Sequence, residues 1–178
     1  MKKAMAALKK CKCKAFDEGC TFGWRGFNNS CYKVMTSFQY SRTLSWENAR
    51  SVCLGFEGDL VTIKNEKQME FLSKISSEVK NESIWIGLIK RLKDGKCVWS
   101  DGTPYNSSVY SNWRSGTTNY TFGKVGCVAL YNNSWVDRSC TSVKSIYICE
   151  KRKGEELCLT SVSVQMSPFK IKISAPLD

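Results

Sequence analysis

The chain has 178 residues, 42% of them hydrophobic, which is enough for one domain with a genuine core and short flanking segments. Its formal net charge is +11. It contains no histidine, which excludes Ser-His and Cys-His nucleophile pairs, imidazole acid/base catalysis and a His-ligated catalytic zinc. No local pattern nominates a catalytic pair of carboxylates either, so we expect a binding protein and no enzyme.

The ten cysteines indicate disulfide bonds. They are spread from Cys11 to Cys158 instead of forming the two Cys-x-x-Cys pairs of a zinc site. This spacing predicts an oxidising compartment, hence a secreted protein or the ectodomain of a membrane protein. Sequons for N-glycosylation corroborate it, at Asn28, Asn81, Asn106, Asn119 and Asn132.

The first segment, residues 1–19, is a basic arm. Six lysines stand in it, at Lys2, Lys3, Lys9, Lys10, Lys12 and Lys14. The arm is either solvated surface or an attractant for polyanions, of which sulfated glycans and anionic membranes fit better than nucleic acid, for which no binding motif is present. Its five-residue apolar stretch is too short for a signal peptide, so we expect any export signal or membrane anchor outside this chain.

Two short amphipathic helices are predicted next. Ser45 can cap a helix that places Trp46, Ala49 and Cys53 on one face, with Glu47 favourably placed in its first turn. A second helix is predicted to start at Asn65, with Gln68 completing a loose capping box. Its inward face would carry four apolar residues, Met69, Leu72, Ile75 and Val79.

Strand patterns dominate the rest of the chain. Short β-favouring runs occupy residues 31–35, 84–88, 125–131, 134–136 and 146–149. Asn132 and Asn133 tolerate the left-handed conformation of a tight hairpin. Helices come first and most strands later, which predicts an α+β fold with an antiparallel sheet. The polar break at residue 151 indicates a domain edge, followed by a tail, residues 151–178, that is disordered or starts another module.

A stretch without either period runs from Trp99 to Lys124 and is rich in Ser, Asn, Gly, Thr and Tyr. Structureless loops of this length in compact domains are usually functional or disordered. Its aromatic residues favour an ordered, packed loop. We therefore expect the binding surface here.

Residues 20–150 resemble a C-type lectin-like domain of the long form. The resemblance covers about 130 residues in the order of that family and does not depend on any single tripeptide. It is carried by Cys20, Gly23-Trp24, Cys31-Tyr32, Trp46 to Cys53, Leu60-Val-Thr-Ile63, Trp85-Ile-Gly-Leu88, Trp99-Ser-Asp-Gly102, Trp113, Cys127, Trp135-Val-Asp137, Cys140 and Tyr147-Ile-Cys-Glu150. It implies core packing, and no contact with sugar, for Trp46, Trp85, Trp99 and Trp135.

The resemblance also implies three framework disulfides, which are Cys20–Cys31, Cys53–Cys149 and Cys127–Cys140. Four cysteines fall outside this pattern, namely Cys11, Cys13, Cys97 and Cys158. They could pair internally, for example Cys97 with Cys158, or link two chains. A metal site at Cys11-Lys-Cys13 is a weaker alternative.

Calcium binding is expected to be lost. Calcium takes six to eight oxygen ligands, and sugar-binding members of this family supply them from a Glu-Pro-Asn or Gln-Pro-Asp motif, a separate Glu and a Trp-Asn-Asp motif. These positions correspond here to residues 117–119, to Val125 and to residues 135–137. Only Asn119 and Asp137 remain as side-chain ligands, and a glycan on Asn119 would cover the site. We expect no cofactor.

The sequence thus predicts an extracellular lectin-like domain that binds a glycan or protein ligand without calcium and does not bind nucleic acid. Side chains that could contact the ligand are Tyr105, Tyr110, Arg114, Asn119, Tyr120, Lys124, Asn133 and Asp137, and each could instead serve in loop packing or remain solvated. Calcium-dependent carbohydrate binding and electrostatic capture of sulfated polysaccharide are the alternatives.

Overall fold

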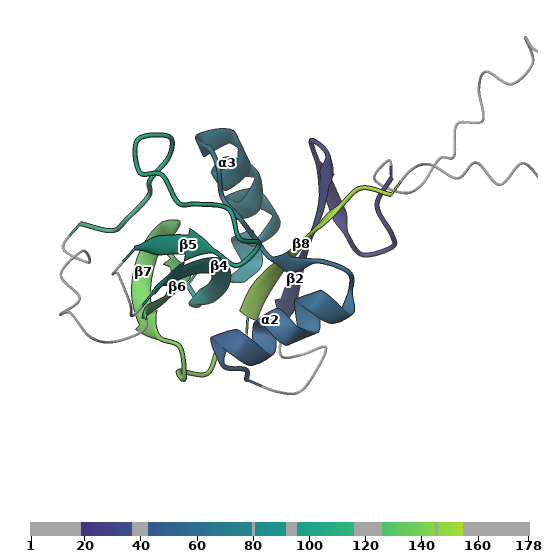
Figure 1. Cartoon of the computed structure of the whole chain (residues 1–178). Helices are drawn as coiled ribbons and strands as arrows, with labels where there is room; N and C mark the ends of the chain where they lie inside the picture. The colour runs from purple at the N-terminus through teal and green to yellow at the C-terminus, as the bar shows by residue number, and fades with distance from the viewer. Residues whose placement is uncertain are drawn as a thin grey trace, which may run out of the picture. The chain divides into compact units, whose positions relative to one another are not determined.

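The structure is a computed structural model that describes residues 19–36, 43–79, 81–91, 96–115, 126–144 and 146–154. An eight-stranded sheet carries one helix near each of its two faces (Figure 1). The basic arm and the predicted tail lie outside the described residues, apart from Gly19 and residues 151–154 at their inner ends. Among the described residues, neither α-helix has the length and apolar composition that a membrane-spanning helix needs.

Helix α2, Trp46–Gly55, begins as predicted. The Ser45 hydroxyl accepts a hydrogen bond from the Asn48 backbone N–H at 3.3 Å, which satisfies one of the free donors of the first turn. Trp46, Ala49 and Cys53 are buried along one side. The predicted spacing therefore gives the observed packing face.

Helix α3, Glu66–Ile75, also begins at its predicted cap, because the Asn65 side chain accepts from the Gln68 N–H at 2.9 Å. It ends earlier than the apolar pattern predicts. The Ser76 backbone N–H and hydroxyl both donate to the Leu72 carbonyl, and this closes the last turn. Val79 consequently lies in a separate 3₁₀ turn, Ser77–Val79.

Every predicted strand lies within or overlaps an observed one. Val125, at the start of the third predicted strand, lies outside the described residues. Three short strands that the sequence did not signal are β1, β3 and β5. The strands are β1 Arg25–Phe27, β2 Ser30–Thr36, β3 Asp59–Leu60, β4 Ile84–Lys90, β5 Cys97–Trp99, β6 Gly126–Tyr131, β7 Ser134–Ser139 and β8 Ile146–Arg152.

The main path through the sheet is β1-β2-β8-β4-β6-β7, with β3 paired to β8 and β5 paired to β4. The pairing is antiparallel, as predicted, except between β4 and β8, which makes the sheet mixed. Strand β8 returns between β2 and β4, antiparallel to β2 and parallel to β4. Strand β8 passes the predicted boundary at residue 150, and Gly154 N–H still donates to the Gly19 carbonyl.

Both faces of the central strands are buried, which explains the continuous apolar run in β4. On the α2 side, Trp85 packs with Trp46 and Cys53 in one cluster. On the opposite face, residues 84, 86 and 88 join Leu72 of α3 in a second cluster. The alternation of β4 side chains between two apolar layers follows from the strand period of two.

Strands β4 and β8 pair only over two residues each and then separate. The opening between them is filled by Val61, whose N–H donates to the Ile148 carbonyl at 2.9 Å and whose carbonyl accepts from Gly87 N–H at 2.9 Å. Gly87 O in turn accepts from Ser100 N–H at 2.7 Å. Backbone from four distant parts of the chain, at residues 61, 87, 100 and 148, therefore meets where β4 and β8 separate. We call this region the fork.

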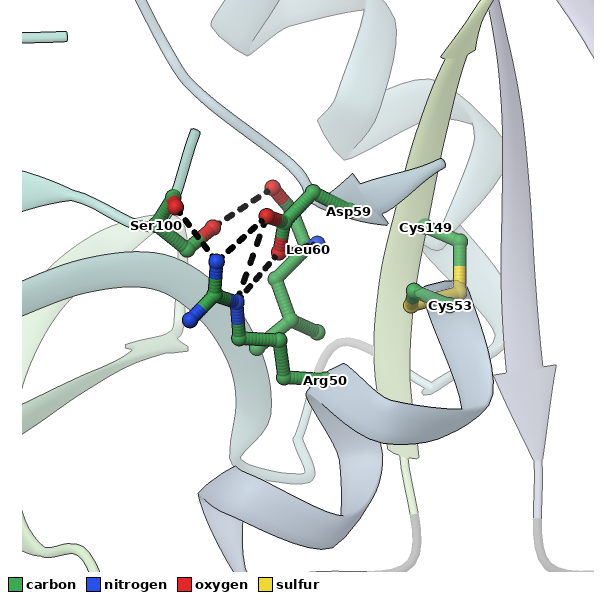
Figure 2. The surroundings of a disulfide bond; sticks show 6 residues. All are labelled: Arg50, Cys53, Asp59, Leu60, Ser100 and Cys149. Atoms are coloured by element: carbon green, nitrogen blue, oxygen red, sulfur yellow. Dashed lines mark hydrogen bonds and ion pairs between the residues drawn. A yellow bond between two sulfur atoms is a disulfide. The ribbon is translucent and has the colours of Figure 1, made fainter. Parts of the chain in front are cut away.

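Arg50 of α2 closes the fork from one side (Figure 2). Its guanidinium donates to both carboxylate oxygens of Asp59, with a shortest distance of 3.0 Å, and to the Ser100 carbonyl at 2.7 Å. Paired, charge-assisted bonds of this kind hold geometry better than single neutral ones. Arg50 thus ties α2 to β3 and to the start of the long loop.

The three disulfides implied by the family resemblance are present. Cys20–Cys31 closes the amino-terminal hairpin, Cys53–Cys149 joins α2 to β8, and Cys127–Cys140 spans β6 and the residue after β7. Among the described cysteines, Cys97 makes no disulfide, and its suggested partner Cys158 lies outside the described residues, as do Cys11 and Cys13.

The fork predicts a sharp difference between two glycines. A methyl group on Gly87 would lie 2.6 Å from Ser100 Oγ and 2.7 Å from the Leu60 carbonyl oxygen, whereas nothing lies within 4 Å of one on Gly55. Gly87→Ala should lower the free energy of unfolding by about 2 kcal/mol or more, and Gly55→Ala, in the last turn of α2, should leave it unchanged or raise it by up to about 1 kcal/mol. Urea denaturation measures both, and equal midpoints would contradict this account.

Candidate ligand-binding surface

The described part of the long loop is ordered against β7, as the aromatic content of the loop predicted. Trp113 forms an isolated bridge with Trp135. The Trp135 N–H donates to the Asn112 carbonyl at 2.8 Å, and Arg114 N–H donates to the Trp135 carbonyl at 3.0 Å. This backbone pairing fixes the returning limb of the loop beside the sheet.

Trp135 is the centre of an aromatic cluster beneath that limb. Four rings meet its indole edge-on, with centroid distances of 5.7 Å for Trp99, Tyr110 and Trp113 and 6.0 Å for Tyr105. Edge-to-face packing is a favoured arrangement for aromatic pairs and adds to the gain from burial. Trp135 is completely buried, so its predicted role in the core is confirmed.

Tyr105 and Tyr110 were expected as ligand contacts or as packing residues, and the structure places both in the packing. The Tyr105 hydroxyl donates to Ser111 Oγ at 3.1 Å and accepts from Trp113 Nε1–H at 3.1 Å. Burial, and next the carboxylate of Glu66, raise the pKa of Tyr110 well above its ordinary value. The two rings support the surface from below.

The hairpin between β6 and β7 joins this loop to α3. Asn132 and Asn133 have φ values of 48° and 61°, the left-handed conformation that was predicted for this turn. The Asn133 carbonyl accepts from Asn112 Nδ2 at 2.6 Å, and its side-chain oxygen accepts from the Ser73 hydroxyl at 2.9 Å. Ser73 had no signal in the sequence, because its partner is 60 residues away.

Arg114 and Asn133 are the two predicted contact residues that remain exposed in the described part. The Arg114 guanidinium carbon lies 5.9 Å from the centroid of the Tyr131 ring, within range of a cation–π interaction. Asn119, Tyr120 and Lys124 lie outside the described residues. The exposed surface that can be described therefore combines a cation on an aromatic ring with an amide-rich hairpin.

Asp137, the remaining predicted calcium ligand in this part of the chain, is buried with an exposed fraction of 8%. Gly126 stands between it and Lys90, since a methyl group on Gly126 would lie 3.7 Å from Lys90 Cβ and 3.9 Å from Asp137 Oδ1. Burial raises the pKa of Asp137, and the positive charges of Lys90 and Arg138 act in the opposite direction. Lys90 was missed by sequence reasoning because only the strand pairing places it there.

No group of three or more His, Cys, Asp or Glu side chains suited to a metal ion occurs among the described residues. The sequons at Asn28, Asn81, Asn106 and Asn132 are exposed. A groove of about 830 Å³ beside β3 and β8 was not foreseen. Its Glu150 carboxylate already accepts from the Tyr32 hydroxyl and the Thr62 N–H, each at 3.1 Å, so this acid is engaged in the fold.

The raised pKa of Asp137 predicts an unusual pH dependence. An acid that ionises less readily in the folded state contributes most to stability at low pH, and the contribution is lost as pH rises through the raised pKa. Wild-type protein should therefore lose stability relative to Asp137→Asn as pH increases above about 3.9. Urea unfolding across the acidic range measures the difference between the two proteins.

Asp101→Asn is the matched control for this experiment, because the pKa of Asp101 is shifted the other way. Burial of Asp101 works against ionisation, but hydrogen bonds from Thr103 and Thr62 and the charge of Lys64 lower its pKa overall. Its contribution is present at neutral pH and is lost as pH falls. Differences of the same sign for both variants would refute the assignment.

Comparison with known proteins agrees with this architecture. The family described as Lectin C-type domain matches residues 42–151. Two relatives from Mus musculus are CD209 antigen-like protein A, 31% identical over 74% of this chain and 52% of its own length, and the low affinity immunoglobulin epsilon Fc receptor, 30% identical over 82% of this chain and 41% of its own. The chain thus spans about half or less of the length of these relatives.

Solved structures show the same likeness. The carbohydrate-recognition domain of the mouse scavenger receptor C-type lectin is 28% identical with a TM-score of 0.63, covering 76% of this chain and 98% of the other. The carbohydrate-recognition domain of cow CD23, in the presence of a GlcNAc2Man3 oligosaccharide, has 28% identity and a TM-score of 0.64, with the same two shares. A calcium-independent type II antifreeze protein, at 22% identity, shares the fold, with a TM-score of 0.61 over 75% of this chain and 94% of its own. The chain belongs to the C-type lectin domain family.

Proposed function

We propose that this chain is the extracellular recognition domain of a C-type lectin-like protein and binds a glycan or protein ligand without calcium. The ligand would meet the exposed side of the long loop and the Asn132–Asn133 hairpin. The domain would bind its ligand without transforming it. The observation that carries the proposal is the rigid construction of this surface from contacts within the chain.

The surface is suited to recognition because its geometry is set before a ligand arrives. Four aromatic rings pack edge-to-face on Trp135, and the Asn112 side-chain amide donates a hydrogen bond to the hairpin at the Asn133 carbonyl. Preorganised surfaces lose less conformational entropy on binding. Above this support, Arg114 lies over the Tyr131 ring, and arginine and tyrosine are common anchors in interfaces. Two similar structures are carbohydrate-recognition domains, which supports a glycan as one class of ligand.

Independence from calcium is supported by the electrostatics around Asp137. A calcium ion needs several oxygen ligands, and Val136 stands where the sugar-binding pattern has an amide. Lys90, across Gly126, already brings a positive charge to this carboxylate. A divalent ion would have to approach the same carboxylate against the charges of Lys90 and Arg138, which weakens its binding.

The calcium proposal is tested by isothermal titration and by ligand capture with and without chelator. We expect no heat of binding for Ca²⁺ in the micromolar range and the same melting temperature in Ca²⁺ and in EDTA. Binding to a glycan array or to a panel of cell surfaces should likewise be unchanged by EDTA. A micromolar calcium constant, together with sugar binding that EDTA abolishes, would establish the calcium-dependent alternative instead.

The location of the surface is tested by a pair of arginine substitutions. Arg114→Ala should weaken binding to whichever array glycans or cells the wild-type protein captures, by about tenfold or more if Arg114 is an anchor. Arg152→Ala removes another exposed arginine, at the end of β8, and should leave capture unchanged. Equal losses in both variants would point to nonspecific electrostatic attraction.

The net charge of +11 favours electrostatic capture of sulfated polysaccharide as an alternative function. The same glycan array distinguishes this alternative from recognition by the loop surface. Binding of that kind should be restricted to sulfated probes and fall steeply between low and moderate salt, because exposed charges are screened within about 10 Å at 0.1 M salt. Ligand recognition by the loop surface should retain most of its affinity over this range.

A further inference from the structure

A hollow of about 220 Å³ lies beside the first half of the long loop. Most of its lining residues are aromatic or aliphatic, and Lys64 is the one cation among them; the others are Ile63, Trp99, Thr103, Pro104, Tyr105, Asn106, Val109 and Tyr110. The rings are fixed because Trp99, Tyr105 and Tyr110 all pack on Trp135. The hollow is therefore preformed, and its amphipathic lining suits a ring with one apolar face and polar edges.

Asn106 belongs to the lining of this hollow and is the acceptor of a sequon, Asn106-Ser-Ser. It begins a tight turn in which its backbone carbonyl accepts from Val109 N–H at 3.1 Å and from Tyr110 N–H at 3.3 Å. Its side-chain oxygen accepts from Ser108 N–H at 2.9 Å. The oxygen of the amide is thus held, and Nδ2, the atom to which an N-linked sugar is attached, is directed away from that bond.

Val109 supplies a second observation at the same place. Val109 is 71% exposed. It lies three residues after Asn106 in the turn and also lines the hollow. An apolar surface next to an exposed acceptor asparagine is what the first ring of a glycan would cover.

We infer that Asn106 carries an N-linked glycan and that its first N-acetylglucosamine lies in this hollow. In the reaction, Asn106 Nδ2 forms a bond to the anomeric carbon of a lipid-diphosphate-linked oligosaccharide. The bond from that carbon to the diphosphate oxygen breaks, the lipid diphosphate leaves with the electron pair, and one Nδ2 proton passes to the transferase. The inference rests on the extracellular placement proposed above.

The attached sugar would act as a part of the folded surface. Its apolar face would pack on Val109 and the aromatic walls, and its polar edge would meet Lys64 and solvent. The glycan would cover this side of the loop. A ligand could then reach only the surface that carries Arg114 and the β6–β7 hairpin.

Occupancy is tested by expressing the chain behind a cleavable signal peptide in a eukaryotic secretory cell and mapping glycopeptides by mass spectrometry. We expect most of the secreted protein to carry a glycan at Asn106. Unmodified Asn106 overturns the inference, whether or not Asn28, at the tip of the β1–β2 hairpin, is modified. Ligand capture is a separate readout, so the proposed function can fail while Asn106 is occupied, and the reverse.

The position of the first sugar is tested by a double-mutant cycle on protein trimmed to a single N-acetylglucosamine. Val109→Ser, which preserves the sequon, should lower the melting temperature by about 2 °C or more in the glycosylated protein and by much less in the Asn106→Gln background. The same substitution in an Asn28→Gln background should retain its full effect. Equal effects of Val109→Ser with and without the Asn106 sugar would overturn the proposed position of the sugar in the hollow. If the Val109→Ser protein is poorly secreted, Val109→Thr is used in its place.

Discussion

The Cys53–Cys149 disulfide holds α2 against β8 just beyond the point where β8 separates from β4 (Figure 2). The two cysteines are 96 residues apart, so the bond closes a loop of most of the domain and removes much of the freedom of the unfolded chain. In the folded state it fixes one side of the fork, and Arg50 fixes another through Asp59 and the Ser100 carbonyl. Strand β8 separates from β4 at this point, and Val61 pairs with the backbone of both strands in the opening.

The fork also affects the proposed binding surface, because the long loop begins there. Ser100, bonded to Gly87, is the first residue of the long loop after β5, so the start of the loop is fixed by the core. The other end of the described loop is fixed by Trp113, Arg114 and the hairpin of β7. The described part of the loop is thus held near both of its ends, and its rings pack on Trp135, which limits the conformations open to the side chains above them.

The features that sequence reasoning found are local in the chain or belong to the family pattern. The caps at Ser45 and Asn65 depend on side chains that bond three residues ahead, and the Asn132–Asn133 turn depends on the tolerance of asparagine for positive φ. What it missed depends on tertiary placement. Strand β3 is only two residues long and exists because β8 offers an edge, and Lys90 reaches the surroundings of Asp137 only because Gly126 lies between the paired strands. Neither has a periodic signal.

Contacts within the chain order the described limb of the long loop. A metal ion can organise a loop by collecting its oxygen atoms, but here the described limb is organised by ring packing on Trp135 and by the Asn112 bonds to the β7 hairpin. If the loop needs no ion for its shape, then its ligand affinity should depend on surface side chains such as Arg114 and should be indifferent to chelation, which is the physical content of the proposed function.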